Sequence, residues 1–330
     1  MNSPSPSHSP QAQISAELQG FIAKAINKER IRLSDPSNHP SVILITDFNE
    51  GLPQSECRGS IIRYGVPSGA IDDQVNTVAA FDIPNAAFHL HQRSQTALAG
   101  DVIIDVVDPG VGNEEENDRR AIARTSDGIY LVGPNNGAFD ALDITDFWEI
   151  DFEALKSHGI YEGQEDARHA TFHGRDVFSP VGAIISHITA ATDDPDLQAQ
   201  LIEELVAKRL ELSELHKLQL GEAEALHHDP YGNIKFNIAL RTLEVEVGEE
   251  VLIELLRGET GRLALRIVDE ESPESIRATV VNSFAEVEDG AWVLYEGSSK
   301  VLGTQEPAVE LAKNLDSAWA SKEAERIHNQ

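Results

Sequence analysis

An aspartate followed by a tight turn is the first feature of this sequence that indicates chemistry. The segment Asp108-Pro109-Gly110-Val111-Gly112 directly follows 102–107, a short run rich in β-branched residues. Such a run is typical of a strand buried on both faces in a parallel sheet. Pro109 and the glycines favour a sharp turn, so we expect Asp108 at the carboxyl edge of the sheet, where open α/β sheets bind ligands. On spacing alone, a turn-capping role for Asp108 is the alternative.

Two further polar residues occupy comparable places. Asp47 leaves the apolar run 41–46, which predicts a strand, and a carboxylate there is well placed for ribose hydroxyls. His173 lies in a loop before the helix predicted over 177–189, where a single histidine is often structural. These residues indicate a site at one edge of a sheet.

The pattern of elements predicts two domains behind an N-terminal extension. Residues 1–40 are interpreted as a disordered, proline-rich tail and an extra amphipathic helix that begins near Ser15. Residues 41–212 alternate strands and helices with short breaks, which predicts a layered α/β domain with a mainly parallel sheet. Period-2 stretches in 213–330 predict a small antiparallel β-barrel-like domain; they are 234–240, 243–247, 263–267, 278–283 and 291–295.

Composition narrows the class of partner. Fifty-six acidic against 26 basic residues give a formal charge of -30. This charge would repel a phosphate backbone, so we expect no nucleic-acid partner and a neutral or cationic ligand. No apolar run approaches the roughly 20 residues of a membrane span, and the first residues lack the basic and apolar regions of a signal peptide. The sequence therefore predicts a cytoplasmic protein that does not enter a membrane.

Motifs for common cofactors and metals are missing from the sequence. There is no phosphate-binding glycine loop, no dinucleotide fingerprint, no Gly-x-Ser-x-Gly elbow and no His-Glu-x-x-His pair. His227-His228-Asp229 suggests metal ligation, but adjacent strand residues point to opposite faces and rarely share one ion. The single cysteine, Cys57, excludes a disulfide framework and is interpreted as an inert core residue. We expect neither a metal nor a cofactor.

Six short motifs in order carry a resemblance to a known family. Together they resemble the S-adenosylmethionine hydroxide adenosyltransferase family, related to the fluorinase and chlorinase enzymes, over about residues 41 to 315. The resemblance implies an N-terminal α/β domain, a C-terminal β-barrel-like domain, and a homotrimer with active sites between domains of neighbouring subunits. The motifs are Thr46-Asp47-Phe48, Val106 to Gly112, Arg119-Arg120-Ala121-Ile122, Gly133-Pro134-Asn135-Asn136-Gly137, Thr171 to Asp176 and Tyr231-Gly232-Asn233.

The same resemblance implies roles for single residues. Asp108, Arg119 and His173 match the catalytic trio of the hydrolytic members, which the halogenating relatives lack, so water or hydroxide is favoured over halide. Substrate contacts are implied as follows: Asp47 for the ribose hydroxyls, Phe81 for a wall beside the ribose, Tyr231 and Asn233 for adenine, Asp229 for the methionine ammonium, and Ser298 and Ser299 for the methionine carboxylate.

The reaction implied is hydrolysis of S-adenosyl-L-methionine to adenosine and L-methionine, without a cofactor. Methionine leaves as a neutral thioether, so no general acid has to protonate it, and the protein has to supply a nucleophile. Water needs positioning, a proton acceptor and a nearby cation. In this scheme His173 accepts the proton, Arg119 stabilises hydroxide and Asp108 orients both.

One departure from the family pattern leaves alternatives open. The acidic segment 113–118 lengthens the connection between Asp108 and Arg119 by about four residues. If this insertion bulges outward, Arg119 keeps its register; otherwise Arg120 takes the role. We expect the insertion to lie outside the pocket, because its carboxylates would oppose an attacking hydroxide. A halide-using transferase and a catalytically inert nucleoside-binding trimer are the alternative functions.

Overall fold

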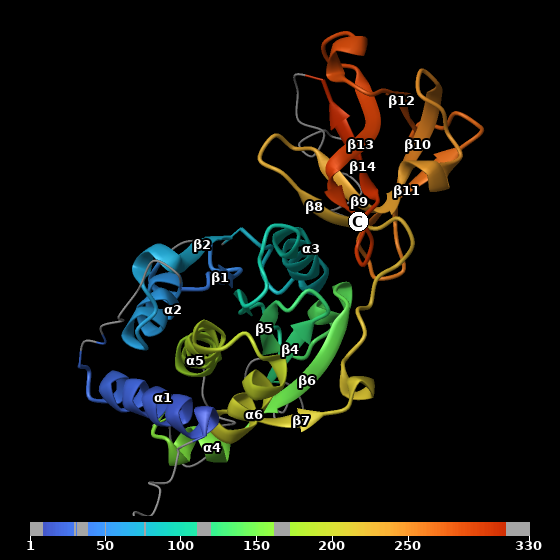
Figure 1. Ribbon diagram of the computed structural model, residues 1–330. Coiled ribbons are helices and arrows are strands. Elements are labelled where there is room, and N and C mark those ends of the chain that lie inside the picture. Colours follow the sequence, from blue (N-terminus) through green and yellow to red (C-terminus); the bar gives the residue numbers. More distant parts are fainter. Residues whose placement is uncertain are drawn as a thin grey trace, which may run out of the picture. The chain divides into compact units, whose positions relative to one another are not determined.

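The computed structural model describes residues 9–29, 31, 39–49, 51–75, 77–110, 120–161 and 172–314. The chain divides into two compact units, residues 1–217 and 218–330, a few residues beyond the boundary drawn from the sequence (Figure 1). Arg119, the acidic insertion 113–118 and the first eight residues of the proline-rich tail lie outside the described residues.

The first unit contains a seven-stranded mixed sheet in the order β2-β1-β3-β5-β4-β6-β7. Strands β2, β1, β3 and β5 run parallel, β4 is antiparallel to β5 and β6, and β7 is antiparallel to β6. Most strands therefore share one direction, which confirms the predicted layered α/β fold with a mainly parallel sheet. The strands are β1 (Val42–Ile45), β2 (Ile71–Val75), β3 (Val102–Asp105), β4 (Arg120–Thr125), β5 (Tyr130–Pro134), β6 (Ile144–Ile150) and β7 (Ala207–Leu210).

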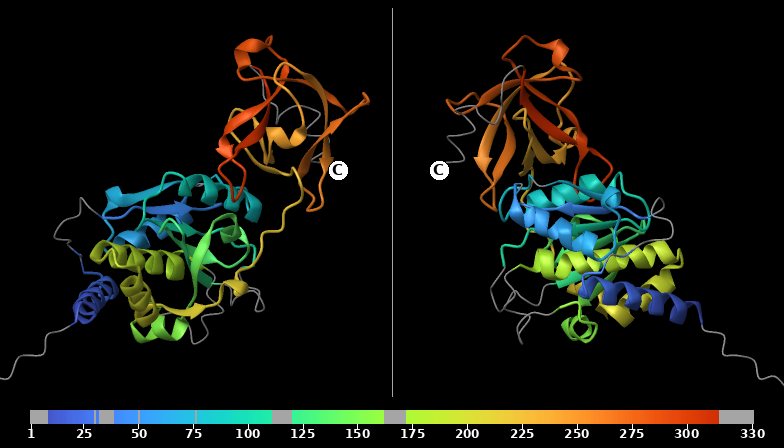
Figure 2. Two further views of the ribbon diagram at one scale, coloured as in Figure 1. Left: turned by 45° about the vertical axis from the view of Figure 1, so that its right-hand side comes forward. Right: turned by 90° about the vertical axis from the view of Figure 1, so that its left-hand side faces the viewer.

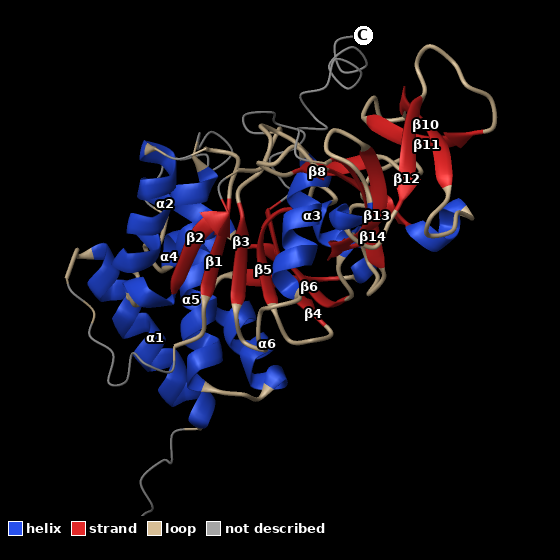
Figure 3. Ribbon diagram, turned by 90° about the horizontal axis from the view of Figure 1, so that it is seen from above, coloured by secondary structure: helices blue, strands red, loops and turns tan. Residues whose placement is uncertain are grey.

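Helices cover both faces of this sheet. The larger core joins one face of the strands, including Val42 and Leu44, to α1, α2, α5 and α6. Ile43 and Ile45 are equally buried but face the other way, where α3 packs against β1 and β3 (Figures 1 and 3). The helices are α1 (Pro10–Ile26), α2 (Leu52–Arg63), α3 (Ile83–Ser94), α4 (Phe152–Ser157), α5 (Ser179–Ala191) and α6 (Pro195–Leu205).

The extra N-terminal helix begins earlier than the sequence predicts. The hydroxyl of Ser9 caps α1 by accepting a bond from the N–H of Ala12, and Pro10 occupies the first turn, where its missing N–H costs nothing. Ser15, the predicted cap, is instead buried and donates to Glu204 of α6 at 2.5 Å. The helix α1 therefore begins at Pro10, and it is packed into the core of the unit.

The second unit is a curved sheet in the order β11-β10-β12-β13-β14-β9-β8. Its edges approach each other through a bridge between Glu224 and Ala264, so the sheet is nearly closed, as Figure 2 shows. The pairings are antiparallel except that of β12 with β13, which confirms the predicted barrel-like domain with one exception to its antiparallel order. Its strands are β8 (Ala225–His228), β9 (Ile234–Ala239), β10 (Glu250–Arg257), β11 (Leu263–Val268), β12 (Ile276–Val280), β13 (Trp292–Lys300) and β14 (Pro307–Lys313).

Several elements differ from the sequence interpretation. The predicted strand 243–247 is wrong, because Leu240–Leu243 forms a short 3-10 turn and Glu244 takes a left-handed backbone with φ of 56°. The strands β6, β7, β8, β10 and β14 were not predicted. No helix among the described residues is long and apolar enough to cross a membrane.

Candidate active site

The carboxyl ends of β1 and β3 lie side by side in the first unit. Ile45 of β1 pairs with Asp105 of β3, so Asp47 and Asp108 follow the ends of adjacent parallel strands. Asp47 Oδ2 accepts a hydrogen bond of 2.8 Å from the backbone N–H of Phe81, and Asp108 Oδ1 accepts one of 3.0 Å from the N–H of Gly110. Both predicted carboxylates thus lie at the same edge, each oriented by a backbone donor.

Phe81 combines exposure with an uncommon backbone conformation. Its φ is 61° and its side chain is 65% exposed. A bulky residue in the left-handed region costs about 1 to 3 kcal/mol, and such strain clusters at functional sites. The strain is coupled to the hydrogen bond with Asp47, which favours a role for this aromatic ring at the sheet edge.

His173 and Arg120 form a buried pair in the same unit. Arg120 Nη1 lies 3.1 Å from His173 Nε2, and the guanidinium carbon of Arg120 lies 4.2 Å from the ring centroid of Phe152. Because arginine has donors and no acceptor, His173 Nε2 accepts this bond and the proton of the neutral imidazole sits on Nδ1. His173 in this state offers an N–H donor from Nδ1.

A glycine brings the His173 segment close to β3. A Cβ added to Gly174 would come within 2.5 Å of Val106 Cγ1 and 3.1 Å of Cys57 Sγ, so the close approach requires glycine. The next residues form a π-helical turn, Gly174–Phe178, ahead of α5. Such turns are frequent at functional sites. This packing places His173 beside the segment that leads from β3 to Asp108.

The asparagine motif after β5 supports the same segment. Asn136 Nδ2 donates to the carbonyl of Val107 at 2.8 Å, and its Oδ1 accepts from the N–H of Ala138 at 3.1 Å. Gly137 follows with φ of 108°, a conformation that favours glycine. Asn136 therefore fixes the backbone immediately before Asp108.

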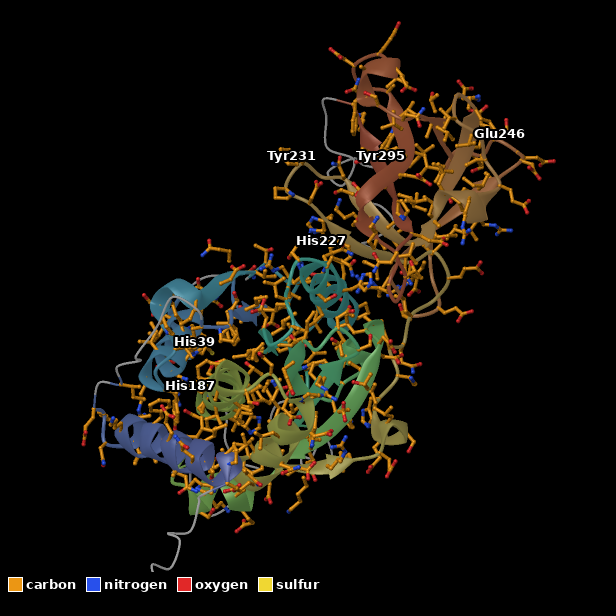
Figure 4. All side chains as sticks on the ribbon, viewed as in Figure 1. His39, His187, His227, Tyr231, Glu246 and Tyr295 are labelled. Carbon is orange, nitrogen blue, oxygen red and sulfur yellow. The ribbon has the colours of Figure 1, made fainter. Side chains whose placement is uncertain are left out.

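The second unit contains a polar cavity of about 540 Å³ that gathers most of its predicted contacts. Asp229, Tyr231, Asn233 and Ser298 all line it; the other lining residues are Lys235, Asn282, Ser283, Phe284, Tyr295, Glu296, Gly297 and Glu310. Figure 4 labels its two tyrosines, Tyr231 in the connection from β8 to β9 and Tyr295 on β13. Tyr231 is 79% exposed, which leaves its ring available to a ligand.

Asp229 organises the turn between β8 and β9. Its Oδ1 accepts from the N–H groups of Tyr231 and Asn233, each at 3.0 Å, and its Oδ2 accepts from Asn233 Nδ2 at 3.0 Å. Gly232 completes the turn with φ of 86°. The carboxylate thus holds both predicted adenine contacts in place as well as lining the cavity.

Glu310 forms a buried network on the floor of this cavity. It accepts from Tyr295 at 2.8 Å and from Ser299 at 3.1 Å, and it pairs with the Lys235 ammonium at 2.6 Å. Lys235 also lies 3.8 Å from Asp229. Burial, followed by the negative charge of Glu310, raises the pKa of Tyr295 above its usual range.

The structure separates the two predicted serines and adds residues that the sequence did not suggest. Ser298 lines the cavity, whereas Ser299 is buried and directed at Glu310. Lys235, Tyr295 and Glu310 were not predicted. A signal for Glu310 was present, because it is the one carboxylate in the apolar run 308–312, where a charge needs a partner.

The described residues also bear on the metal and cysteine interpretations. Among them, no group of three or more His, Cys, Asp or Glu side chains is arranged to hold a metal ion. Cys57 is fully buried, and burial raises the pKa of its thiol to about 12. A thiol in this state is a poor nucleophile, in agreement with the predicted inert role.

Comparison with known proteins gives a consistent picture. Residues 42–193 match the family model described as SAM hydroxide adenosyltransferase N-terminal domain. The (R)-S-adenosyl-L-methionine hydrolase of Thermus thermophilus is 30% identical over 283 residues, which cover 84% of this chain and 93% of the relative. The protein of the same name from Methanocaldococcus jannaschii is 29% identical over 224 residues, which cover 65% of this chain and 73% of the relative.

Two solved structures share the fold. An uncharacterized conserved protein from Thermotoga maritima superposes with a TM-score of 0.62 at 22% identity, over 84% of this chain and 94% of its own. A conserved hypothetical protein from Thermus thermophilus superposes with a TM-score of 0.55 at 24% identity, over 85% of this chain and 94% of its own. Both likenesses extend through the two units of the chain.

Proposed function

We propose, because the chain belongs to the S-adenosylmethionine hydroxide adenosyltransferase family, that it hydrolyses S-adenosyl-L-methionine to adenosine and L-methionine. The relatives named above are S-adenosyl-L-methionine hydrolases, and the match to the Thermus thermophilus protein spans both units. The observation that carries the proposal is the polar edge of the first unit, where Asp47 and Asp108 follow adjacent strands and Arg120 holds His173.

The charge of the second unit's cavity supports a cationic substrate. Asp229, Glu296 and Glu310 contribute carboxylates to its lining, and Lys235 contributes the ammonium. The balance is negative, which favours a ligand that carries a sulfonium and an α-ammonium group. Tyr231 and Asn233 then serve adenine, Asp229 the ammonium, and Ser298 the carboxylate of methionine.

In the proposed reaction, the oxygen of water bonds to ribose C5′ while the C5′–S bond breaks and sulfur keeps the electron pair. His173 holds the attacking oxygen through its Nδ1–H, and Asp108 orients the water and takes up its proton, which then passes to solvent. Asp47 binds the ribose hydroxyls and Phe81 borders the sugar. Arg119 remains the proposed stabiliser of hydroxide, with Arg120 positioning His173. Methionine leaves as a neutral thioether, so the step needs neither a metal nor a redox cofactor.

The tautomer of His173 changes the role assigned from the sequence. While Arg120 donates to Nε2, that nitrogen has no lone pair for the proton of water, so His173 acts as a donor. Proton uptake accordingly moves to Asp108. We also propose a cytoplasmic enzyme without a nucleic-acid partner; the formal charge of -30 supports the absence of a nucleic-acid partner.

The activity is tested with purified protein and S-adenosyl-L-methionine, in separate reactions with each configuration at the sulfonium, because the relatives' name specifies (R). We expect adenosine and methionine in equal amounts. Chloride or fluoride should leave the product unchanged, whereas a 5′-halogenated nucleoside would indicate the halide-using alternative. Ligand binding without any product would indicate the catalytically inert nucleoside-binding trimer.

Glu310→Gln is expected to weaken substrate binding more than turnover. The change removes the main partner of Lys235 and the acceptor charge that holds Tyr295, so we expect KM to rise about tenfold or more with kcat less affected. Glu306→Gln is the matched control, since Glu306 pairs with exposed Arg241 outside the cavity. Equal KM values for the two variants would show that Glu310 does not contribute to substrate binding.

We propose a homotrimer in which each site takes residues from both units, supplied by neighbouring subunits. Light scattering should then give three times the chain mass in the active fraction, and an active monomer would contradict the proposal.

Mixed assembly gives a sharper test. Co-refolding inactive His173→Ala and Asp229→Ala chains in equal amounts should restore about a quarter of the sites if subunits complement each other. No recovery is expected if each chain builds its own site.

A further inference from the structure

Asp105 is a buried carboxyl group that the proposed mechanism does not use. It ends β3, three residues before Asp108, and its side chain is 0% exposed. Oδ1 accepts a hydrogen bond of 3.1 Å from the N–H of Val107, while Oδ2 is buried and has no hydrogen-bond partner among the described residues. A charged carboxylate in this place would lie in an apolar strand with half of its acceptors unmet.

The surroundings of Asp105 supply no positive charge from the described residues. On one side β1 contributes Ile45, its partner in the strand pairing, and on the other β5 contributes the backbone of Gly133. A Cβ added to Gly133 would come within 2.6 Å of the Asp105 carbonyl oxygen, so the space there is filled by main chain. The charged groups that act on Asp105 are Asp108 and Asp47, both carboxylates.

Burial is the main cause of an altered acidity. The pKa of Asp105 is raised to about 8, mainly by burial; the hydrogen bond from the N–H of Val107 lowers this pKa, and the charges of Asp108 and Asp47 contribute to raising it. When like charges share a site, the member with the poorest solvation keeps the proton. Asp108 is half-buried and Asp105 fully buried, so the proton stays on Asp105.

We propose that Asp105 is a positioning residue that carries its carboxyl as a neutral acid behind the sheet edge, and so leaves Asp108 as the charged group facing the nucleophile. The effect of Asp105 on the reaction rate rests on the proposed function. The protonation of Asp105 rests on the fold alone. Ionisation of Asp105 would add a second negative charge behind Asp108, which opposes the build-up of hydroxide on the attacking water.

The protonation is tested in the intact protein by infrared difference spectroscopy. We expect a protonated-carboxyl band that persists at neutral pH, disappears as the pH rises through about 8, and is missing from Asp105→Asn. Wild-type protein in which every carboxyl ionises below about pH 6 would overturn the proposal. This measurement needs no substrate, so it stands even if the protein proves inactive.

Stability gives a second readout with a definite sign. The pKa of Asp105 is raised in the folded state, so its stabilising contribution is complete below the unfolded value of 3.8 and is lost progressively up to about 8. Asp105→Asn should therefore match wild type near pH 4. Above pH 4, the folding equilibrium constant of the variant, divided by that of wild type, should rise about tenfold with each pH unit, up to about pH 8. Exposed Asp127→Asn is the control, and an equal gain in both variants would contradict the proposal.

The effect on rate is measured as the ratio of hydrolysis at pH 9 to that at pH 7. We expect the wild-type rate at pH 9 to be about one tenth of the rate at pH 7. The decline should be smaller in Asp105→Asn, because the asparagine cannot ionise. An identical alkaline decline in both proteins, with the infrared band present, would show that Asp105 is protonated but does not act on the reaction. Absence of hydrolysis in wild type would instead refute the proposed function.

Discussion

Replacing His173 with alanine is expected to slow adenosine formation about 100-fold or more. The imidazole is buried, held by Arg120 at 3.1 Å, and packed beside the segment that carries Asp108. Its loss removes the donor that holds the attacking oxygen. Adenosine release is followed by chromatography at saturating substrate, and thermal unfolding shows whether the variant stays folded.

Two further variants separate the possible roles of His173. Asparagine places an N–H donor where Nδ1 lies, and glutamine places a polar atom where Nε2 lies. If His173 acts as a donor from Nδ1, Asn should retain more activity than Ala or Gln. If His173 accepts the proton instead, Asn should be as inactive as Ala, which would restore the role assigned from the sequence.

Arg120→Ala is expected to reduce turnover to a similar extent, about 100-fold, since a small displacement of a catalytic group can cost that much. The variant removes the hydrogen bond to His173 Nε2 and the contact with Phe152. Arg120→Lys keeps the positive charge but loses the planar guanidinium, so we expect only partial activity. Hydrolysis rates of both are compared with that of Phe152→Leu, which keeps the bond to His173 and should change the rate little.

Arg119→Ala completes this comparison. The family resemblance implies hydroxide stabilisation by Arg119, with Arg120 as the alternative, and the structure joins Arg120 to His173. We expect Arg119→Ala to lower kcat and Arg120→Ala to lower both kcat and thermal stability, because Arg120 is buried. Wild-type kcat in Arg119→Ala would assign both functions to Arg120.

The sequence was informative where local pattern determines structure. The β-branched run before Asp108 is β3, and the run before Asp47 is β1, so both carboxylates could be placed at one sheet edge before the fold was known. The motif Tyr231-Gly232-Asn233 was identified from the family resemblance, and it lies in the turn between β8 and β9. These residues are close in sequence to the elements that position them.

The remaining site residues depend on pairings between distant segments. Neighbouring residues of a strand point to opposite faces, so a shift of one residue exchanges Arg119 and Arg120, and the length of segment 113–118 obscures that register. Glu310 meets Lys235 and Tyr295 only because β14 lies between β9 and β13. Asp105 and Glu310 nevertheless share a signal, a single carboxylate within an apolar strand, and both prove to be buried.

The most direct test of the central claim is the fate of oxygen in the product. Wild-type protein is incubated with S-adenosyl-L-methionine in water enriched in heavy oxygen, with and without chloride, and the nucleoside is analysed by mass spectrometry. We predict adenosine with one heavy oxygen at C5′, methionine without label, and no effect of chloride. Unlabelled adenosine, a chlorinated nucleoside, or no nucleoside at all would contradict attack by water at C5′.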